Sequence, residues 1–122
     1  MGVQPLGAEA MARSFARSLM ARDSRAAAAH LAADVRIVTP DGTELAGRER
    51  AAEVLDQVTD SGQELEIRVG RTVVNGSVAL CRQWWRRHSV GESGGFEIST
   101  SARLVLARTA SRWEIVIVSP WE

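Results

Sequence analysis

The stretch from Arg22 to Arg48, RDSRAAAAHLAADVRIVTPDGTELAGR, contains the features that decide the fold of this chain. It begins with an alanine-rich segment that Asp23 or Ser24 can cap, because a short side-chain oxygen accepts a hydrogen bond from the free N–H groups at a helix start. This part of the stretch predicts a short helix that runs through Leu31.

A small hairpin is predicted immediately after this helix. The run from Val35 to Val38 alternates apolar and polar residues, and Pro40-Asp41-Gly42 supplies the residues of a turn. Thr43 to Ala46 can then return as a second short strand. Gly47 and the residues after it begin another helical pattern.

Two longer helices are predicted on either side of that stretch. From about Pro5 to Met20 the apolar residues recur at every fourth position, which is the pattern of an amphipathic helix that lies across a sheet. From Gly47 to about Thr59 a second apolar stripe recurs, and the polar residues 60–62 end it. The first stripe consists of Met11, Phe15 and Leu19, and the second of Ala51, Val54, Leu55 and Val58.

The chain after Gln63 has the patterns of β-strands. Asn75-Gly76 between two alternating runs indicates a hairpin, because both central residues of a type I′ turn need a positive φ. The glycine-containing segment 91–95 separates the next two runs as a hairpin loop. Helices followed by antiparallel strands in a meander predict an α+β domain. The predicted strands are Leu65–Val74, Val78–Ser89, Phe96–Ala107 and Arg112–Val118.

Composition limits the class of protein. A length of 122 residues corresponds to a single domain, residues 1–122, that can bury a core without disulfides or metal. Fifteen basic residues balance fifteen acidic ones, which disfavours nucleic acid and anionic membranes as partners. No apolar stretch is long enough to span a membrane, and no targeting segment is found. The single cysteine, Cys81, is expected to pack as a small hydrophobe in a cytoplasmic protein.

The order of these segments resembles the nuclear transport factor 2-like superfamily. The residues that carry the resemblance are Asp34-Val35, Thr39-Pro40-Asp41-Gly42-Thr43, Gly47-Arg48-Glu49 and the C-terminal segment Trp113–Trp121. The small bacterial members called SnoaL-like or ketosteroid isomerase-like are the most similar. The resemblance implies a cone-shaped curved antiparallel sheet, packed against three N-terminal helices around a pocket.

The direction of the side chains on the strand Val78–Ser89 decides which of them could enter such a pocket. Both faces of this strand contain a tryptophan, Trp84 on the even-numbered face and Trp85 on the odd-numbered face. The comparison with ketosteroid isomerase directs the even-numbered residues inward; in the alternative, Trp85 faces the core and the arginines reach solvent or a partner. With the even set inward, the predicted substrate-binding residues are Phe15, Leu19, Val38, Thr39, Arg82, Trp84, Leu104 and Val118.

The resemblance also bears on the chemistry. Ketosteroid isomerase needs a carboxylate base, together with a tyrosine and a protonated aspartate that bind the enolate oxygen. The matching positions here hold Thr39, Phe15 and Ala102, so steroid isomerisation by that set of groups is not expected. Arg86 and His88 remain as catalytic candidates, because arginine stabilises negative charge and imidazole titrates near neutral pH.

The other candidate sites have structural explanations. His30 on the short helix is expected to be a structural or surface histidine. The sequence contains no phosphate-binding glycine loop, nucleophile elbow or metal-ligand cluster, so no cofactor and no metal is predicted.

Two functions remain open. The first is a small-molecule-binding enzyme, such as a cyclase or isomerase acting on a hydrophobic carbonyl-bearing metabolite in secondary metabolism. The second is a non-catalytic ligand-binding or assembly module of the same fold. In both, apolar residues on the two faces of the strand Arg112–Val118 favour a homodimer through the outer sheet face.

Overall fold

The fold is that of an α+β domain, as the sequence predicts. The computed structural model describes residues 7–39, 41–59, 63–89, 97–110 and 112–119. The predicted helix end at residues 60–62, the loop at residues 91–95 and Trp121 lie outside these ranges. In chain order the elements are α1 (Ala8–Met20), α2 (Ser24–Ala28), β1 (Leu31–Val38), β2 (Glu44–Ala46), α3 (Arg48–Thr59), β3 (Gln63–Asn75), β4 (Val78–Ser89), β5 (Glu97–Thr109) and β6 (Arg112–Ser119).

The short helix α2 starts as predicted and ends early. Its N-cap is Asp23, whose Oδ1 accepts a 3.0 Å hydrogen bond from the backbone N–H of Ala26. The helix stops at Ala28, and Leu31, which the sequence places in the helix, is instead the first residue of β1. Leu31 is fully buried there. Its packing in the sheet outweighs the weak helix preference of so short a segment.

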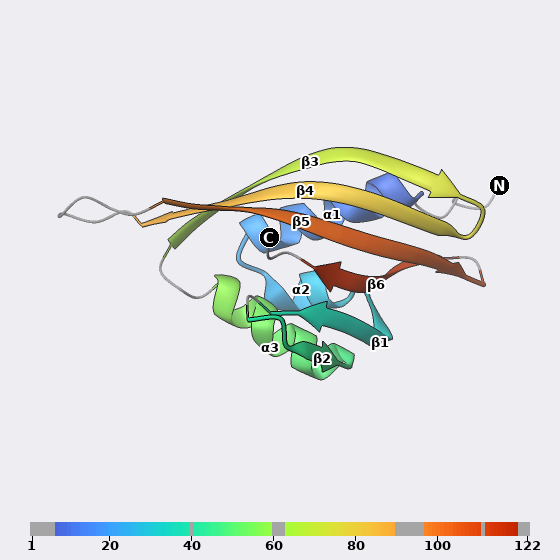
Figure 1. The fold of residues 1–122 in the computed structure, drawn as a ribbon, viewed down its shortest axis with the longest axis horizontal. Helices are drawn as coiled ribbons and strands as arrows, with labels where there is room; N and C mark the ends of the chain where they lie inside the picture. The colour runs from blue at the N-terminus through green and yellow to red at the C-terminus, as the bar shows by residue number, and fades with distance from the viewer. Residues whose placement is uncertain (1–6, 40, 60–62, 90–96, 111, 120–122) are drawn as a thin grey trace.

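The six strands form one mixed sheet in the order β2-β1-β6-β5-β4-β3. The last four strands are the predicted antiparallel meander, and β1 joins its β6 edge in parallel orientation. The sheet is therefore not wholly antiparallel. Figure 1 shows the long strands β3, β4 and β5 arching together over α1, while α3 lies beside β1 and β2.

The hairpin between β3 and β4 forms with a different turn from the predicted one. Asn75 pairs with Val78, so the two loop residues are Gly76 and Ser77. Gly76 has a φ of 62°, whereas Asn75 has no positive φ. A positive φ at the first central residue alone is the requirement of a type II′ turn, which also suits the twist of a hairpin.

The core lies between the helices and one face of the sheet. The predicted stripe of α1 is buried, with Phe15 and Leu19 fully inaccessible. A register shift between Val69 and Thr72 interrupts the pairing of β3 with β4, and a bulge of this kind bends the strand. Beneath these strands α1 packs against β3, and α3 packs against α2 and β1.

Candidate functional site

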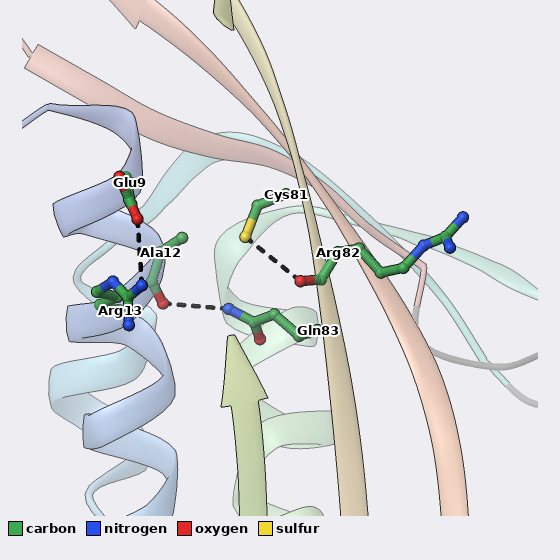
Figure 2. Close-up of polar contacts among 6 residues, drawn as sticks. All are labelled: Glu9, Ala12, Arg13, Cys81, Arg82 and Gln83. Carbon is green, nitrogen blue, oxygen red and sulfur yellow. Dashed lines mark hydrogen bonds and ion pairs between the residues drawn. The ribbon is translucent and has the colours of Figure 1, made fainter. Parts of the chain in front are cut away.

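The odd-numbered side chains of β4 face the core, which reverses the prediction. Gln83 is fully buried and Trp85 is 3% exposed, whereas Trp84 is 47% exposed. Figure 2 shows Gln83 reaching toward α1 and Arg82 extending away from it. Because side chains alternate along a strand, a match that is one residue out of register exchanges the two faces. Burying the even-numbered face would also place Arg82 and Arg86 in the core, at a large cost in desolvation.

Gln83 and Trp85 fill the interior that the resemblance assigns to a deep pocket. The side-chain amide of Gln83 donates a 3.1 Å hydrogen bond to the backbone oxygen of Ala12 in α1. The indole N–H of Trp85 donates a 3.0 Å hydrogen bond to the side-chain oxygen of Gln83. The polar groups of both side chains are thus paired inside the protein, as burial requires.

Four of the predicted pocket residues lie in the packed core. Phe15, Leu19, Leu104 and Val118 are completely buried, and Val38 is half-buried. None of these five borders the cavities found among the described residues. Phe15, Leu19, Leu104 and Val118 belong to the hydrophobic core cluster, so the structure gives these four a packing role.

An open cavity of about 510 Å³, called the mouth below, lies between the β1–β2 hairpin, α3 and β4. Of the predicted substrate-binding residues, Thr39 borders it. The sequence analysis did not predict Arg87, on the inward face of β4, or Gln57 of α3 as site residues, and it named Val54 and Val58 only as part of a helix stripe. The lining consists of Thr39, Asp41, Thr43, Val54, Gln57, Val58 and Arg87.

Asp41 and Arg87 bring opposite charges to the mouth. The hydroxyl of Thr39 and the backbone N–H of Thr43 both donate to the Asp41 carboxylate. These hydrogen bonds, that of Thr39 first, lower the pKa of Asp41 to about 2, because donors stabilise the ionised form. Asp41 is therefore a carboxylate at neutral pH and a weak proton acceptor. The turn residue of the Pro-Asp-Gly motif thus also contributes charge to the mouth.

The predicted catalytic residues Arg86 and His88 lie on the outer face of the sheet, away from the mouth. Arg86 forms a 3.1 Å ion pair with Glu66. His88 Nε2 lies 2.9 Å from a carboxylate oxygen of Glu64. Both contacts join directly opposite residues of β3 and β4. The sequence offered no acidic neighbour of His88 on its own strand, and the carboxylate that orients it comes from the adjacent one.

A second open cavity, of about 840 Å³ and called the outer trough below, lies over β3, β4 and β5. Trp84 and Arg86 border it, while Arg82 lies outside the lining of the described cavities. The lining consists of Glu66, Arg68, Val69, Trp84, Trp85, Arg86, Ser99, Thr100 and Ser101.

His30 has the structural setting that the sequence predicts. Its Nε2 lies 3.1 Å from the hydroxyl of Ser14 on α1, and its backbone oxygen accepts a hydrogen bond from Ile115. Burial, and to a smaller extent the positive charge of Arg112, lower the pKa of His30 from its ordinary value of 6.5. The described residues contain no group of three potential metal ligands. Of the helices described, none has the length and apolarity needed to cross a bilayer.

Residues 12–116 match the sequence profile of the family described as a SnoaL-like domain. The chain belongs to the SnoaL-like family. No curated protein matches it significantly. Of the three residues that the resemblance matches to the isomerase base and oxyanion donors, Thr39 borders the mouth, and Phe15 and Ala102 are buried in the core.

Solved structures with the same fold come from several bacteria. A candidate calcium/calmodulin-dependent protein kinase type II association domain from Thiobacillus denitrificans has a TM-score of 0.75 and 20% identity, with 100% of both chains covered. A candidate dehydratase of the NTF2-like family from Streptomyces avermitilis has a TM-score of 0.75 and 15% identity, covering 91% of this chain and 90% of its own.

A candidate polyketide cyclase from Xanthomonas campestris has a TM-score of 0.68 and 17% identity, covering 92% of this chain and 87% of its own. At these identities the likeness establishes the NTF2-like fold. Because one fold can support many functions, this likeness does not assign a function to the chain.

Proposed function

We propose that this protein binds a small, hydrophobic, carbonyl-bearing molecule at the mouth. The observation that carries the proposal is the combination of a filled interior and an open mouth. Gln83 and Trp85 are buried on the inward face of β4, while the mouth, two residues further along that face at Arg87, is an open cavity of about 510 Å³. That volume lies within the usual range for a small-molecule site.

The chemistry of the lining defines the ligand. Val54 and Val58 give the α3 side of the mouth an apolar wall. Arg87 provides hydrogen-bond donors, and no acidic side chain among the described residues is within ion-pair distance of it. Its charge is offset by the Asp41 carboxylate, which also borders the mouth. A neutral molecule that presents a carbonyl oxygen to Arg87 fits this balance better than an anion.

The same lining favours binding without proton transfer. Neither histidine borders the mouth, and the carboxylate of Asp41, with its pKa of about 2, binds protons weakly. A general base works best when its pKa is near the operating pH. The non-catalytic ligand-binding module is therefore the first candidate function.

The second candidate is a cyclase or isomerase acting on the same class of ligand. The neighbours described as a candidate polyketide cyclase and a candidate dehydratase support it. In this version the mouth would orient the substrate, and Arg87 would stabilise negative charge that develops on the carbonyl oxygen. If the protein converts a carbonyl compound on incubation and Arg87→Gln loses that conversion, this candidate is supported. Recovery of the unchanged compound contradicts it.

Calorimetric titration with acetylnaphthalene, a neutral aromatic ketone, tests the binding proposal. Isopropylnaphthalene has a similar shape without the carbonyl and should bind more weakly. Arg87→Gln should weaken binding of the ketone by about tenfold, because a hydrogen bond to a charged donor is lost. The matched control is Arg50→Gln, which removes the same charge from an exposed position of α3 outside the mouth. Equal affinities of both variants would contradict the proposal.

We also propose that two copies associate through the outer sheet face. One apolar residue from each of β3, β4, β5 and β6 lies directly opposite the next, so the four form a row across the sheet. Three of the four are exposed large hydrophobic residues, and a contiguous apolar surface of this kind is typical of an interface. This apolar row consists of Val73, Leu80, Val105 and Ile117.

A further inference from the structure

The outer trough is lined by serine hydroxyl groups of β5 next to the exposed ring of Trp84. Ser99 and Ser101 on β5 are paired with Arg86 and Trp84 on β4. Trp84 is paired on its other side with Arg68 of β3. The trough therefore presents an indole ring, guanidinium groups and hydroxyls on one face of three adjacent strands.

Gly70 provides the space in which the Trp84 ring lies. A Cβ atom at position 70 would be 2.7 Å from Cζ3 of Trp84 and 2.9 Å from the backbone oxygen of Arg82. The six-membered ring of Trp84 thus rests directly against the backbone of β3, where a side chain would displace it. Because 47% of Trp84 is still exposed, the ring is both supported on one side and accessible to a ligand.

The charges in the trough are not balanced. The lining contains two guanidinium groups, Arg68 and Arg86, and one carboxylate, Glu66. Glu66 is already in an ion pair with Arg86. Among the described residues Arg68 has no carboxylate within ion-pair distance. One positive charge therefore faces the trough without compensation.

We propose that the outer trough is a second binding site, for a small molecule that combines an aromatic ring with a carboxylate. Trp84 offers a face for stacking of a flat ring. The planar fork of a guanidinium matches the two oxygens of a carboxylate, so Arg68 is the group that pairs with the ligand's charge. The hydroxyls of Ser99 and Ser101 add hydrogen-bond donors beside it.

Position and charge distinguish this site from the mouth and from the apolar row. The mouth lies on the inward face of β4, and its charges offset one another. Leu80 of the apolar row is four residues from Trp84 and six from Arg86 on β4, which corresponds to roughly 13 to 20 Å along a strand. Two copies that meet along the row can therefore leave the trough accessible at the edge of their interface.

Titration of the full chain with benzoate tests the proposal, and benzamide is the neutral probe of the same shape. The readout is the indole N–H resonance of Trp84 in a ¹H–¹⁵N spectrum, assigned with the variant Trp84→Phe. Benzoate should shift this resonance to saturation, and benzamide should bind about tenfold more weakly, since it lacks the charge. Arg68→Gln should weaken benzoate binding by a similar factor. Arg71→Gln is the matched control, because Arg71 is exposed on β3 and lies outside the trough.

Three results would overturn the proposal. Equal shifts with benzoate and benzamide would show that no charge is recognised. Unchanged affinity in Arg68→Gln would remove the pairing group. If benzoate bound to Val73→Asp but not to the unmodified protein, the second copy would cover the trough in the dimer. The unmodified protein would then have no ligand site there. The first and second results leave the proposed function of the mouth untouched, because Arg87 and Arg68 are tested with different probes.

Discussion

The indole N–H of Trp85 donates a 3.0 Å hydrogen bond to the side-chain oxygen of Gln83, two residues earlier on the same strand. Gln83 in turn donates to the backbone oxygen of Ala12, so the two side chains connect β4 to α1. Both side chains are buried, and these hydrogen bonds pair their polar groups inside the protein. Among the residues that the structure describes, the mouth borders the inward face of β4 and the outer trough lies over its outer face.

Replacing Gln83 should destabilise the protein. Gln83→Leu keeps the approximate size of the side chain but removes both hydrogen bonds and leaves the Ala12 carbonyl without this donor. The expected loss in free energy of unfolding is about 1 to 3 kcal/mol, the usual cost of removing one partner of a buried polar group. Denaturant titration measures it. Arg82→Leu, one residue away on the outer face, should change stability by less than about 0.5 kcal/mol; equal losses in the two variants would contradict the role of Gln83.

Local patterns predicted the elements well, and long-range relationships were harder to obtain. The stripe of α1 and the strands of the meander follow from spacing within single segments. The parallel pairing of β1 with β6 joins segments about eighty residues apart, and the sequence contains no local signal for it. The end of α2 was misplaced because Leu31 suits a helix and a buried strand equally well.

The candidate site was predicted only in part, because the prediction depended on which face of β4 points into the protein. Trp84 and Trp85 give both faces of β4 a large aromatic residue, so hydrophobicity does not decide between them. Charge does, because Arg82 and Arg86 share a face and cannot both be buried without partners. With that criterion Arg87 becomes an inward residue near the end of the strand, which is where the mouth is found.

Acidic conditions should destabilise the protein through His30. The pKa of this residue is lowered in the fold, by burial and by Arg112. As the pH falls below the unfolded value of 6.5, the unfolded chain binds a proton that the folded protein still excludes, so stability decreases. The melting temperature should therefore drop between about pH 7.5 and about pH 5.5, and His30→Gln should reduce that drop. The same drop in both proteins would assign the effect to another group.

Arg112 gives an independent check on the same histidine. Arg112→Gln removes the positive charge that disfavours protonation of His30, so an NMR titration should find the pKa of His30 higher than in the unmodified protein. Burial would still keep that pKa below its ordinary value. A lower pKa in the variant would contradict the assignment of Arg112.

The Thr39 hydroxyl should control the ionisation of Asp41. Thr39→Val removes the largest cause of the lowered pKa, so the pKa of Asp41 should rise from about 2 toward its ordinary value of 3.8. Thr39→Ser retains the hydroxyl and should keep the low pKa.

The stabilising contribution of the Asp41 carboxylate is present at a pH above its ordinary pKa of 3.8 and is lost as the pH falls toward about 2. Thr39→Val should therefore be less stable than the unmodified protein at about pH 5, and the difference should shrink toward about pH 2. Identical Asp41 titration curves for the valine and serine variants would exclude the hydroxyl as the cause.

Two neighbouring residues of β3 provide a matched test of the proposed homodimer. Val73 and Val74 are 55% and 54% exposed, but their side chains point to opposite faces of the sheet. Val73 belongs to the apolar row, whereas Val74 is paired with the inward-facing Ala79. Val73→Asp should place a charge in the interface, where leaving it unpaired is costly, and sedimentation at micromolar concentration should then find a monomer. Val74→Asp adds the same charge at the same exposure and should remain dimeric. If both variants sediment as the unmodified protein does, the apolar row is not the contact between copies, because a buried aspartate there would have separated them.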